Sequence, residues 1–433
     1  MGSRHSIINH RAALAALVLG TAVHALYAQP AKPLSLDEAL SIAQARAPSL
    51  TAASRGAQAS SYLAISASQL PDPVLRAGVD NLPVNGPDAW SFDRDFMTMR
   101  RIGVMQEYVS SEKRKLMRTR NELDAARLDM TRHTLTVNLR RDVAMAWLER
   151  YYAVKSRQLL KSLESEVEIQ LQTLESQLRA GKATAIESPM ATAMLLQTRD
   201  RVLMADKQER LANIVLARWL GDDAKREPGT PPNIETLPLD LANPDVVNAA
   251  PPLQEHSREM DIAKAELMIA EKNKSPNWSW ELAYQQRGSD YSNMISFGVS
   301  VPLTLNSANR QDPEVAAKRA QVEQTEQLHE DMLREVQSGV ASAYTEWQSL
   351  IERRKRLADA LLPVARQRIE LSLAAYRAGQ SSLASVLEAR RAEVEARMQL
   401  LDLERETARL WAQLQFIYAD SANAQTHAQG VQP

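Results

Sequence analysis

The amino-acid sequence repeats itself once, and this repetition restricts the fold more than any other feature. Four short matches occur in the same order at offsets of 195 to 203 residues. They pair Ala47-Pro48-Ser49-Leu50 with Ala250-Pro251-Pro252-Leu253; Gly103-Val104 with Gly298-Val299; Val143, Ala146, Trp147 and Glu149 with Val340, Ala343, Tyr344 and Glu346; and Arg179-Ala180-Gly181 with Arg377-Ala378-Gly379. One such match could be chance, but four at nearly constant spacing indicate a duplicated unit of roughly 200 residues.

Each copy of the unit begins with a helical segment. Ser35-Leu36-Asp37-Glu38 has the form of a capping box, which starts a helix. The helical pattern that follows breaks at Pro48, and its counterpart in the second copy spans about Pro252–Lys274. Pro71 and Pro276 end these two segments, because proline has no N–H for the helical hydrogen bond.

Two strands are predicted next in each copy, at about 73–82 and 97–108 and again at about 277–286 and 294–303. Trp278, Trp280 and Tyr284 alternate with polar residues. A period of two over about ten residues is typical of transmembrane strands, and an ordinary half-buried hairpin is the alternative. The three aromatic residues fit either a girdle at a membrane interface or core packing. Met97–Tyr108 has no clean apolar face.

A long helical hairpin is predicted at the end of each copy. Val104–Ala180 contains neither Gly nor Pro, and a helix of about 70 residues would be roughly 105 Å long. We expect the first hairpin to turn at Gly181 and the second at Gly379, because a turn favours a residue that accepts positive φ. In the second hairpin, Gly339 and Pro363 predict local bending.

These elements divide the chain into five parts. Ala12–Val23 is an apolar run between basic residues and small ones, which is typical of a signal peptide. The segment between the copies contains seven prolines and is predicted to form neither a strand nor a long helix. The predicted parts are a signal peptide (1–28), a first repeat (29–220), a proline-rich linker (221–252), a second repeat (253–418) and a polar, disordered tail (419–433).

Composition excludes several classes of function. With 52 basic and 53 acidic residues mixed along the chain, there is no basic patch for nucleic acid. The absence of cysteine excludes disulfides and cysteine–metal sites, as well as a lipid anchored on cysteine. The seven histidines show no metal-ligand spacing, and no phosphate loop or catalytic triad is found. We therefore expect no enzyme activity, no cofactor and no metal centre.

The layout of the strands requires several chains if they cross a membrane. Outside the N-terminal segment no run of about 18 apolar residues exists, so only strands could span a bilayer. Four strands cannot close a barrel, and an open sheet would leave unpaired backbone groups in hydrocarbon. Several copies pooling their strands, with the long hairpins continuing from them, would form a conduit.

The sequence resembles the TolC-like outer-membrane efflux proteins over nearly all of its predicted mature length. The resemblance rests on Leu36-Asp37-Glu38-Ala39-Leu40, on the paired strands, and on Tyr376-Arg377-Ala378-Gly379 followed by Ser382-Leu383 and Val386-Leu387-Glu388. It implies a homotrimer in the outer membrane with a twelve-stranded β-barrel continuous with a periplasmic α-helical barrel. It also implies docking to a periplasmic adaptor protein and an inner-membrane pump of the RND type.

The resemblance assigns roles to residues at the hairpin turns. Glu187 and Glu388 would form rings of carboxylates at the periplasmic gate, and Ser385 stands where the family often has an acid. The alternative for both glutamates is a solvated helix surface. The adaptor-docking tips would comprise Arg179, Ala180 and Gly181 in the first copy and Tyr376, Arg377, Ala378 and Gly379 in the second. Each arginine also suits a helix C-terminus without any partner.

The transported substrate is the least constrained prediction. Motifs at five places are similar to the branch of the family that serves heavy-metal cation pumps. They are Leu70-Pro71-Asp72-Pro73, Asn81-Leu82-Pro83, Gln106-Glu107, Glu112-Lys113-Arg114 and Val301-Pro302-Leu303. Drug or solvent efflux and type I secretion are the alternatives within the family. A periplasmic adaptor would have one hairpin and many strands, and a coiled-coil scaffold would lack the paired strands.

Overall fold

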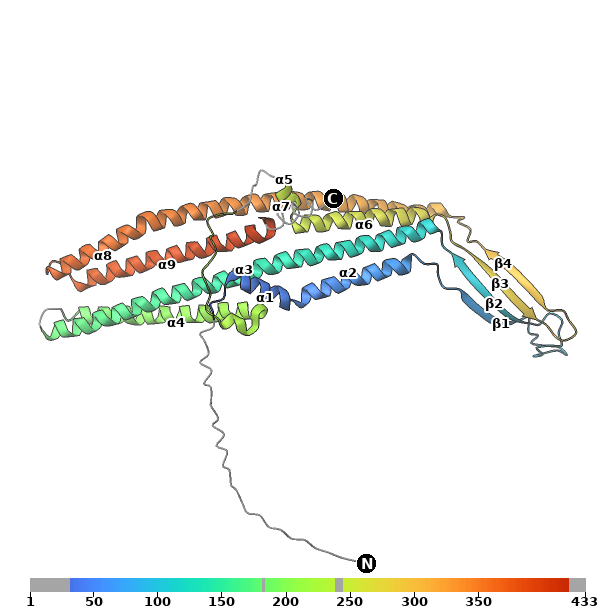
Figure 1. Ribbon diagram of the computed structural model, residues 1–433, viewed down its shortest axis with the longest axis horizontal. Coiled ribbons are helices and arrows are strands. Elements are labelled where there is room, and N and C mark those ends of the chain that lie inside the picture. The colour runs from blue at the N-terminus through green and yellow to red at the C-terminus, as the bar shows by residue number, and fades with distance from the viewer. Residues whose placement is uncertain (1–31, 181–183, 238–243, 420–433) are drawn as a thin grey trace, which may run out of the picture.

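The protein is long and narrow, with helices side by side along most of its length and one sheet at an end (Figure 1). The computed structural model describes residues 32–180, 184–237 and 244–419. The described helices are α1 (Leu36–Arg46), α2 (Pro48–Ala67), α3 (Ser111–Arg179), α4 (Glu187–Leu220), α5 (Pro244–Asn248), α6 (Pro251–Asn273), α7 (Gln311–Arg356), α8 (Leu362–Arg377) and α9 (Leu383–Leu414). The predicted fold class, mainly helical with a small β part, is confirmed.

The helices of the first repeat start at residues that can cap them. The Ser35 hydroxyl accepts a hydrogen bond from the Glu38 N–H at 3.2 Å at the start of α1. Pro48 occupies the first turn of α2, where its missing N–H leaves no bond unmade, so the chain breaks between α1 and α2 as expected. Helix α3 has 69 residues and no interruption. At 1.5 Å per residue it is about 104 Å long.

The second hairpin has a local defect that the first one lacks. Between α7 and α8, residues Leu357–Leu361 form a π-helical turn, in which the Leu362 N–H donates to the Leu357 carbonyl. Pro363 follows this turn directly. Of the two residues at which local bending was expected, Gly339 and Pro363, the second therefore lies next to an observed irregularity of the helix. The bending expected at Gly339 stays a prediction, since this residue lies inside α7, which continues unbroken around it. One glycine weakens a helix but removes no hydrogen bond.

The four strands form one antiparallel sheet in the order β1 (Val74–Asp80), β2 (Met99–Tyr108), β3 (Trp278–Gln286) and β4 (Met294–Ser300). Strands β2 and β3 pair with Val104 opposite Leu282, so the boundary between the two copies lies in the middle of the sheet. The outer edges of β1 and β4 have no partner strand within the described residues.

The largest core cluster lies near the middle of the molecule and contains both copies of a tryptophan contact. Trp147 is fully buried and its indole N–H donates to the Leu34 carbonyl at 3.1 Å. Trp347 donates to the Ile234 carbonyl at the same distance. In both cases 113 residues separate donor and acceptor. The structural counterpart of Trp147 is therefore Trp347, and the pairing of Trp147 with Tyr344 was wrong by three residues.

Several predicted features fall outside the described residues. They are the signal peptide at 1–28, the turn residue Gly181 and most of the tail at 419–433. The segment between the copies contains a 3₁₀ turn at Gly221–Lys225 and the short helix α5, and α6 begins at Pro251.

Candidate functional site

One face of the sheet is apolar and exposed. The strand register places Ile102 of β2, Tyr284 of β3 and Ile295 of β4 side by side, followed two residues on by Val104, Leu282 and Phe297. Phe297 is 68% exposed and Ile295 is 75% exposed. Aromatic and aliphatic side chains of this size are normally buried unless a partner or lipid covers them. The face therefore requires a covering that a single chain does not provide.

The opposite face of the same sheet is polar. Its residues are Val74, Arg76, Gly78 and Asp80 on β1, Met99, Arg101, Gly103, Met105 and Glu107 on β2, Ser279, Glu281, Ala283 and Gln285 on β3, and Met294, Ser296, Gly298 and Ser300 on β4, so its apolar members are few and lie mostly near the strand ends. Met97–Tyr108, which has no clean face in sequence, takes part in both faces, because Arg101 and Gly103 lie opposite the side that carries Ile102 and Val104. The alternation was visible in the other predicted strands and hidden in Met97–Tyr108.

The predicted interface aromatics lie at two different heights of the sheet. Trp278 begins β3 next to the helices, where its ring lies 5.2 Å from the ring of Tyr108. Tyr284 lies six residues further along the strand, which is about 20 Å away. Trp278, Trp280 and Tyr284 all belong to the apolar face. Their role at a membrane interface stays a prediction, with Tyr108 added to the Trp278 end.

The joint between the sheet and the helices is made by residues of two motifs named above, Gln106-Glu107 and Glu112-Lys113-Arg114. Lys113 is buried, and its ammonium donates to the Ser275 carbonyl at 3.2 Å and to the Asn277 side chain at 3.0 Å. Arg114 donates to the Ser68 carbonyl at 2.7 Å. Burial lowers the pKa of Lys113, and the nearby Glu107 carboxylate opposes that effect. These two cations satisfy backbone carbonyls just beyond α2 and α6 where the chain enters the sheet.

The second hairpin tip has a complete Schellman motif. Helix α8 ends at Arg377, and Gly379 follows with φ of 73°. The Gly379 N–H donates to the Tyr376 carbonyl at 3.0 Å and the Gln380 N–H to the Ala375 carbonyl at 2.9 Å. The expectation that Gly379 takes positive φ is confirmed. Arg377, Ala378 and Gly379 are exposed at this tip, and Tyr376 is half-buried.

The first hairpin tip is described on both sides of its turn. Arg179 is the last residue of α3, and the Ala180 N–H donates to the Ser176 carbonyl at 3.2 Å. Helix α4 starts at Glu187, whose N–H donates to the Thr184 carbonyl. The two hairpin tips lie at the same end of the molecule, away from the sheet (Figure 1).

The predicted gate residues lie near the starts of α4 and α9 and differ in surroundings. Glu388 is exposed, and its carboxylate lies 3.4 Å from the guanidinium of Arg368 on α8. Glu187 is half-buried in the first turn of α4. The Ser385 hydroxyl donates to the Ser382 carbonyl at 2.7 Å and contacts the Ser381 hydroxyl. Ser385 therefore hydrogen-bonds within the first turn of its own helix.

A small apolar cluster connects the two tips. It contains Leu174 of α3, Ala191 of α4, and Leu383, Val386 and Leu387 of α9. Ala191 lies one turn after Glu187, and Leu387 directly precedes Glu388. The predicted gate residues are thus attached to one shared core.

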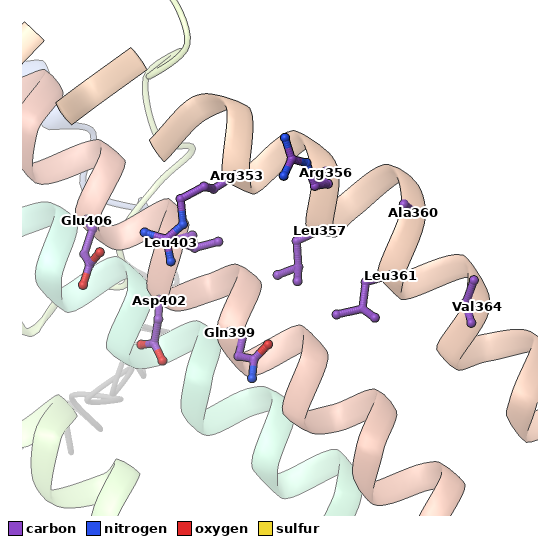
Figure 2. A pocket seen from close by; sticks show the side chains of 10 residues that line it. All are labelled: Arg353, Arg356, Leu357, Ala360, Leu361, Val364, Gln399, Asp402, Leu403 and Glu406. Carbon is purple, nitrogen blue, oxygen red and sulfur yellow. The ribbon is translucent and has the colours of Figure 1, made fainter. Parts of the chain in front are cut away.

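A cavity of about 710 Å³ opens beside the π-helical turn, between α7–α8 and α9 (Figure 2). Leu357, Leu361 and Leu403 contribute apolar surface to it. Charged side chains line the rest, from Arg353 and Arg356 on one helix and from Asp402 and Glu406 on the other.

The described ranges hold neither a metal-binding cluster nor a membrane-spanning helix. No group of three or more His, Asp or Glu side chains there could hold a metal ion. No helix in those ranges is both long enough and apolar enough to cross a membrane.

One protein-family model matches part of this chain. The protein-family model described as "Outer membrane efflux protein" matches residues 243–419, which include the whole second repeat from α6 to α9. Over this part of its length, the chain is similar to the outer membrane efflux protein family. The predicted resemblance is confirmed. No curated protein matches the sequence.

Solved structures with the same fold include several channels. CusC, whose structures concern transmembrane channel formation, has 17% sequence identity and a TM-score of 0.73, with coverage of 88% of this chain and 91% of CusC. The outer membrane protein VceC from Vibrio cholerae has 16% identity and a TM-score of 0.71, covering 88% and 95% of the two chains. The outer-membrane channel OprN has 17% identity and a TM-score of 0.75, covering 88% and 89%. At these identities the likeness shows that this chain shares their fold, which spans both repeats.

Sequence reasoning missed one group of residues on the polar face. Arg76, Arg101 and Glu281 lie on three adjacent strands and form ion pairs. The available signal was a charged residue with glycine two positions away within a predicted strand, as in Arg76-Ala77-Gly78 and Arg101-Ile102-Gly103.

Proposed function

We propose that three copies of this chain form a passive outer-membrane duct through which an export system releases its substrates. The duct would consist of a twelve-stranded barrel in the outer membrane and a helical tunnel in the periplasm. The observation that carries the proposal is the sheet with one exposed apolar face and one polar face. Lipid on the first face and water on the second would satisfy both.

The open edges of the sheet support assembly from several copies. Strands β1 and β4 would each leave a row of unpaired N–H and C=O groups in the bilayer, at several kcal/mol per group. Two copies would supply eight strands, but the interior of a barrel of about eight strands is filled by side chains or holds one small ligand. Three copies supply twelve strands, so three is the smallest number of copies that exceeds this size.

Exposed apolar side chains on the helices support the same assembly. Contacts order the hairpin helices as α4, α3, α9 and α8, so α4 and α8 lie at opposite edges (Figure 1). Helix α4 exposes Met190, Leu196, Leu203, Met204, Leu211, Ile214 and Val215. At the other edge, Leu361, Val364 and Leu371 are exposed at helical spacing. We propose that α4 of one copy packs against the α8 edge of the next, which closes a ring.

The hairpin tips would serve as gate and docking surface. Rings of Glu187 and Glu388 carboxylates, one of each from every copy, would attract cations and repel one another at the narrow end. Ser385 would line the same ring without a charge. The exposed residues Arg179, Ala180, Arg377, Ala378 and Gly379, with Tyr376 and Gly181, would contact a periplasmic adaptor, which in turn would couple the duct to an inner-membrane RND-type pump.

Heavy-metal cations are the proposed cargo. The carboxylates near the tips favour cations over anions. Motifs similar to the heavy-metal branch point the same way, although Lys113 and Arg114 also have a structural task at the joint. Drug or solvent efflux, or type I secretion, is the second candidate.

Membrane fractionation tests the duct. The full-length protein should be recovered in the outer membrane, and it should migrate as a trimer on gels without heating and as a monomer after heating. Such resistance to detergent is expected when strands of different copies share one closed sheet. Recovery as a monomer in the soluble periplasm would overturn the proposal.

Conductance in planar bilayers tests the gate. Replacing both acids (Glu187→Ala with Glu388→Ala) should lower the preference for cations, because six carboxylates leave a trimer. The matched control removes two exposed acids from α7 (Glu323→Ala with Glu330→Ala), far from the tips. If the gate variant keeps the cation preference of the wild type, these residues do not form the ring.

A further inference from the structure

Four charged residues on the polar face of the sheet form one network across three strands. Arg76 of β1 donates to Glu281 of β3 at 3.1 Å. Arg101 of β2 lies 3.8 Å from the same carboxylate and 3.5 Å from Asp80 at the end of β1. Glu281 therefore joins two arginines of the first repeat to a strand of the second.

Glycine stands opposite each charged residue of this network except Asp80. Arg76 pairs with Gly103, Arg101 with Gly78, and Glu281 with Gly298 in the strand register. An added Cβ at Gly78 or Gly298 would meet no atom within 4 Å. The face is therefore open beside Gly78 and Gly298, whereas a Cβ at Gly103 would lie 2.8 Å from the Ala283 Cβ. Met105, which pairs with Glu281, shares this level of the face with the charged side chains.

The network is balanced in charge. Arg76 and Arg101 contribute two positive charges, and Asp80 and Glu281 contribute two negative ones, so the sum is zero. The Arg76 side chain is 45% exposed, while that of Glu281 is 23% exposed. The positive groups therefore reach further into solvent than the carboxylate that compensates them.

We propose that Glu281 sets the ion preference of the β part of the duct by neutralising the two arginines that project from its wall. This inference rests on the proposed function, since it requires the polar face to line the lumen. Without Glu281, each copy would keep two guanidinium groups against the single carboxylate of Asp80, so three copies would present a ring with a net positive charge, which favours anions. With it, ions of either sign pass the ring, and the carboxylates at the tips alone select cations.

The network has a smaller part in holding the sheet together. Its pairs are partly exposed, and such pairs contribute little to stability. The main-chain hydrogen bonds of β1, β2 and β3 already fix the register. Substitution of a charged residue here should therefore leave the assembly intact while it changes the electric field in the lumen.

Reversal potentials of purified trimers in planar bilayers test the assignment. Glu281→Gln keeps the size of the side chain but removes its negative charge. It should raise the anion-over-cation permeability ratio by roughly two- to threefold at low salt, where screening is weak because the screening length is about 10 Å at 0.1 M. The effect should shrink at 1 M salt. Arg76→Gln should shift the ratio in the opposite direction, and the double variant should return close to the wild-type value.

Two controls separate the possible failures. Glu330→Gln removes an exposed acid from α7, outside the sheet, and should leave the ratio unchanged. Heat-modifiable migration shows whether each variant still assembles, and Arg76→Gln tests the network independently if Glu281→Gln fails to assemble. An unchanged ratio in conducting variants would overturn this inference alone. A wild-type trimer that never conducts would overturn the proposed duct instead.

Discussion

Gly379 illustrates how a single residue determines a hairpin tip. Its φ of 73° lies in the left-handed region, and the two N–H groups at Gly379 and Gln380 satisfy carbonyls at the end of α8. A side chain at this φ costs about 1–2 kcal/mol because its Cβ approaches the next carbonyl. Nothing lies within 4 Å of the space that a Cβ would occupy, so the cost comes from the backbone alone.

Gly379→Ala should therefore destabilise the tip by about 1 kcal/mol. Hydrogen exchange of the Gln380 amide, which donates to Ala375, should become faster by roughly fivefold, which is this free energy expressed as a rate ratio. Gly339→Ala is the matched control. It lies inside α7 with only the Tyr418 hydroxyl 4.0 Å away, and alanine there should slow local exchange. Equal responses at both sites would contradict this account.

Glu404 shows the effect of burial on a carboxyl group. Burial raises its pKa, the Arg354 guanidinium lowers it, and Glu235 raises it. The folded protein therefore holds this proton at pH values where the unfolded chain has lost it. Stability from this group is complete below the ordinary pKa of 4.5 and is lost as pH rises through the higher folded pKa.

Glu404→Gln should consequently raise the melting temperature at pH 7 and change it less at pH 4. Circular dichroism of the purified protein at both pH values measures this. Glu406→Gln, on the same helix, is the control and should show no such difference. A larger gain at pH 4 than at pH 7 for Glu404→Gln would show that Arg354 outweighs burial.

The long elements were predictable because their signals are long. Sixty-nine residues without Gly or Pro leave few alternatives to a helix, and α3 fills that run. Short-range detail was less predictable. The π-helical turn at Leu357–Leu361 has no composition signal of its own, since only its neighbour Pro363 is unusual. The register of Trp147 with Trp347 depends on hydrogen bonds to distant carbonyls, which local similarity cannot reveal.

Pro363 explains the π-helical turn. In a regular helix its ring would collide with the Asp359 carbonyl, and the wider turn relieves that collision. Pro363→Ala should let α7 and α8 join as one α-helix and raise the free energy of local opening by about 1–3 kcal/mol. Slower hydrogen exchange at Leu361 and Leu362 would reveal it. Pro251→Ala, in the first turn of α6, should change exchange little, and equal slowing there would argue against this cause.

At the scale of the whole molecule, the candidate site could be located from sequence only in part. The tips follow from the turn motif, and Glu187, Ser385 and Glu388 do lie at the starts of helices. The charged network on the polar face could not be predicted, because Arg76, Arg101 and Glu281 come together only through strand pairing between the two repeats. The shared core of Leu174, Ala191 and Leu387 depends on the same long-range packing.

Assembly can be tested by a charge at the predicted edge between copies. Leu203 of α4 is 65% exposed in the single chain. Leu203→Glu should leave the chain folded but abolish the heat-modifiable trimer, because an unpaired charge would be buried between copies. Lys207→Glu, one turn away, also adds negative charge and should be tolerated if it stays in solvent. A normal trimer from Leu203→Glu would place the contact between copies elsewhere.

The interruption beside Pro363 gives the two hairpins unequal mechanical stiffness. Helix α3 reaches its tip without a break, whereas α8 extends 16 residues, or about 24 Å, beyond the π-helical turn that would serve as its pivot. A rotation of roughly 10° at that pivot would displace its far end by about 4 Å, more than the width of a water molecule. One repeat would thus act as a fixed strut and the other as a lever arm. The diameter of the opening enclosed by three chains would then be adjusted from mid-length, far from any residue that lines it.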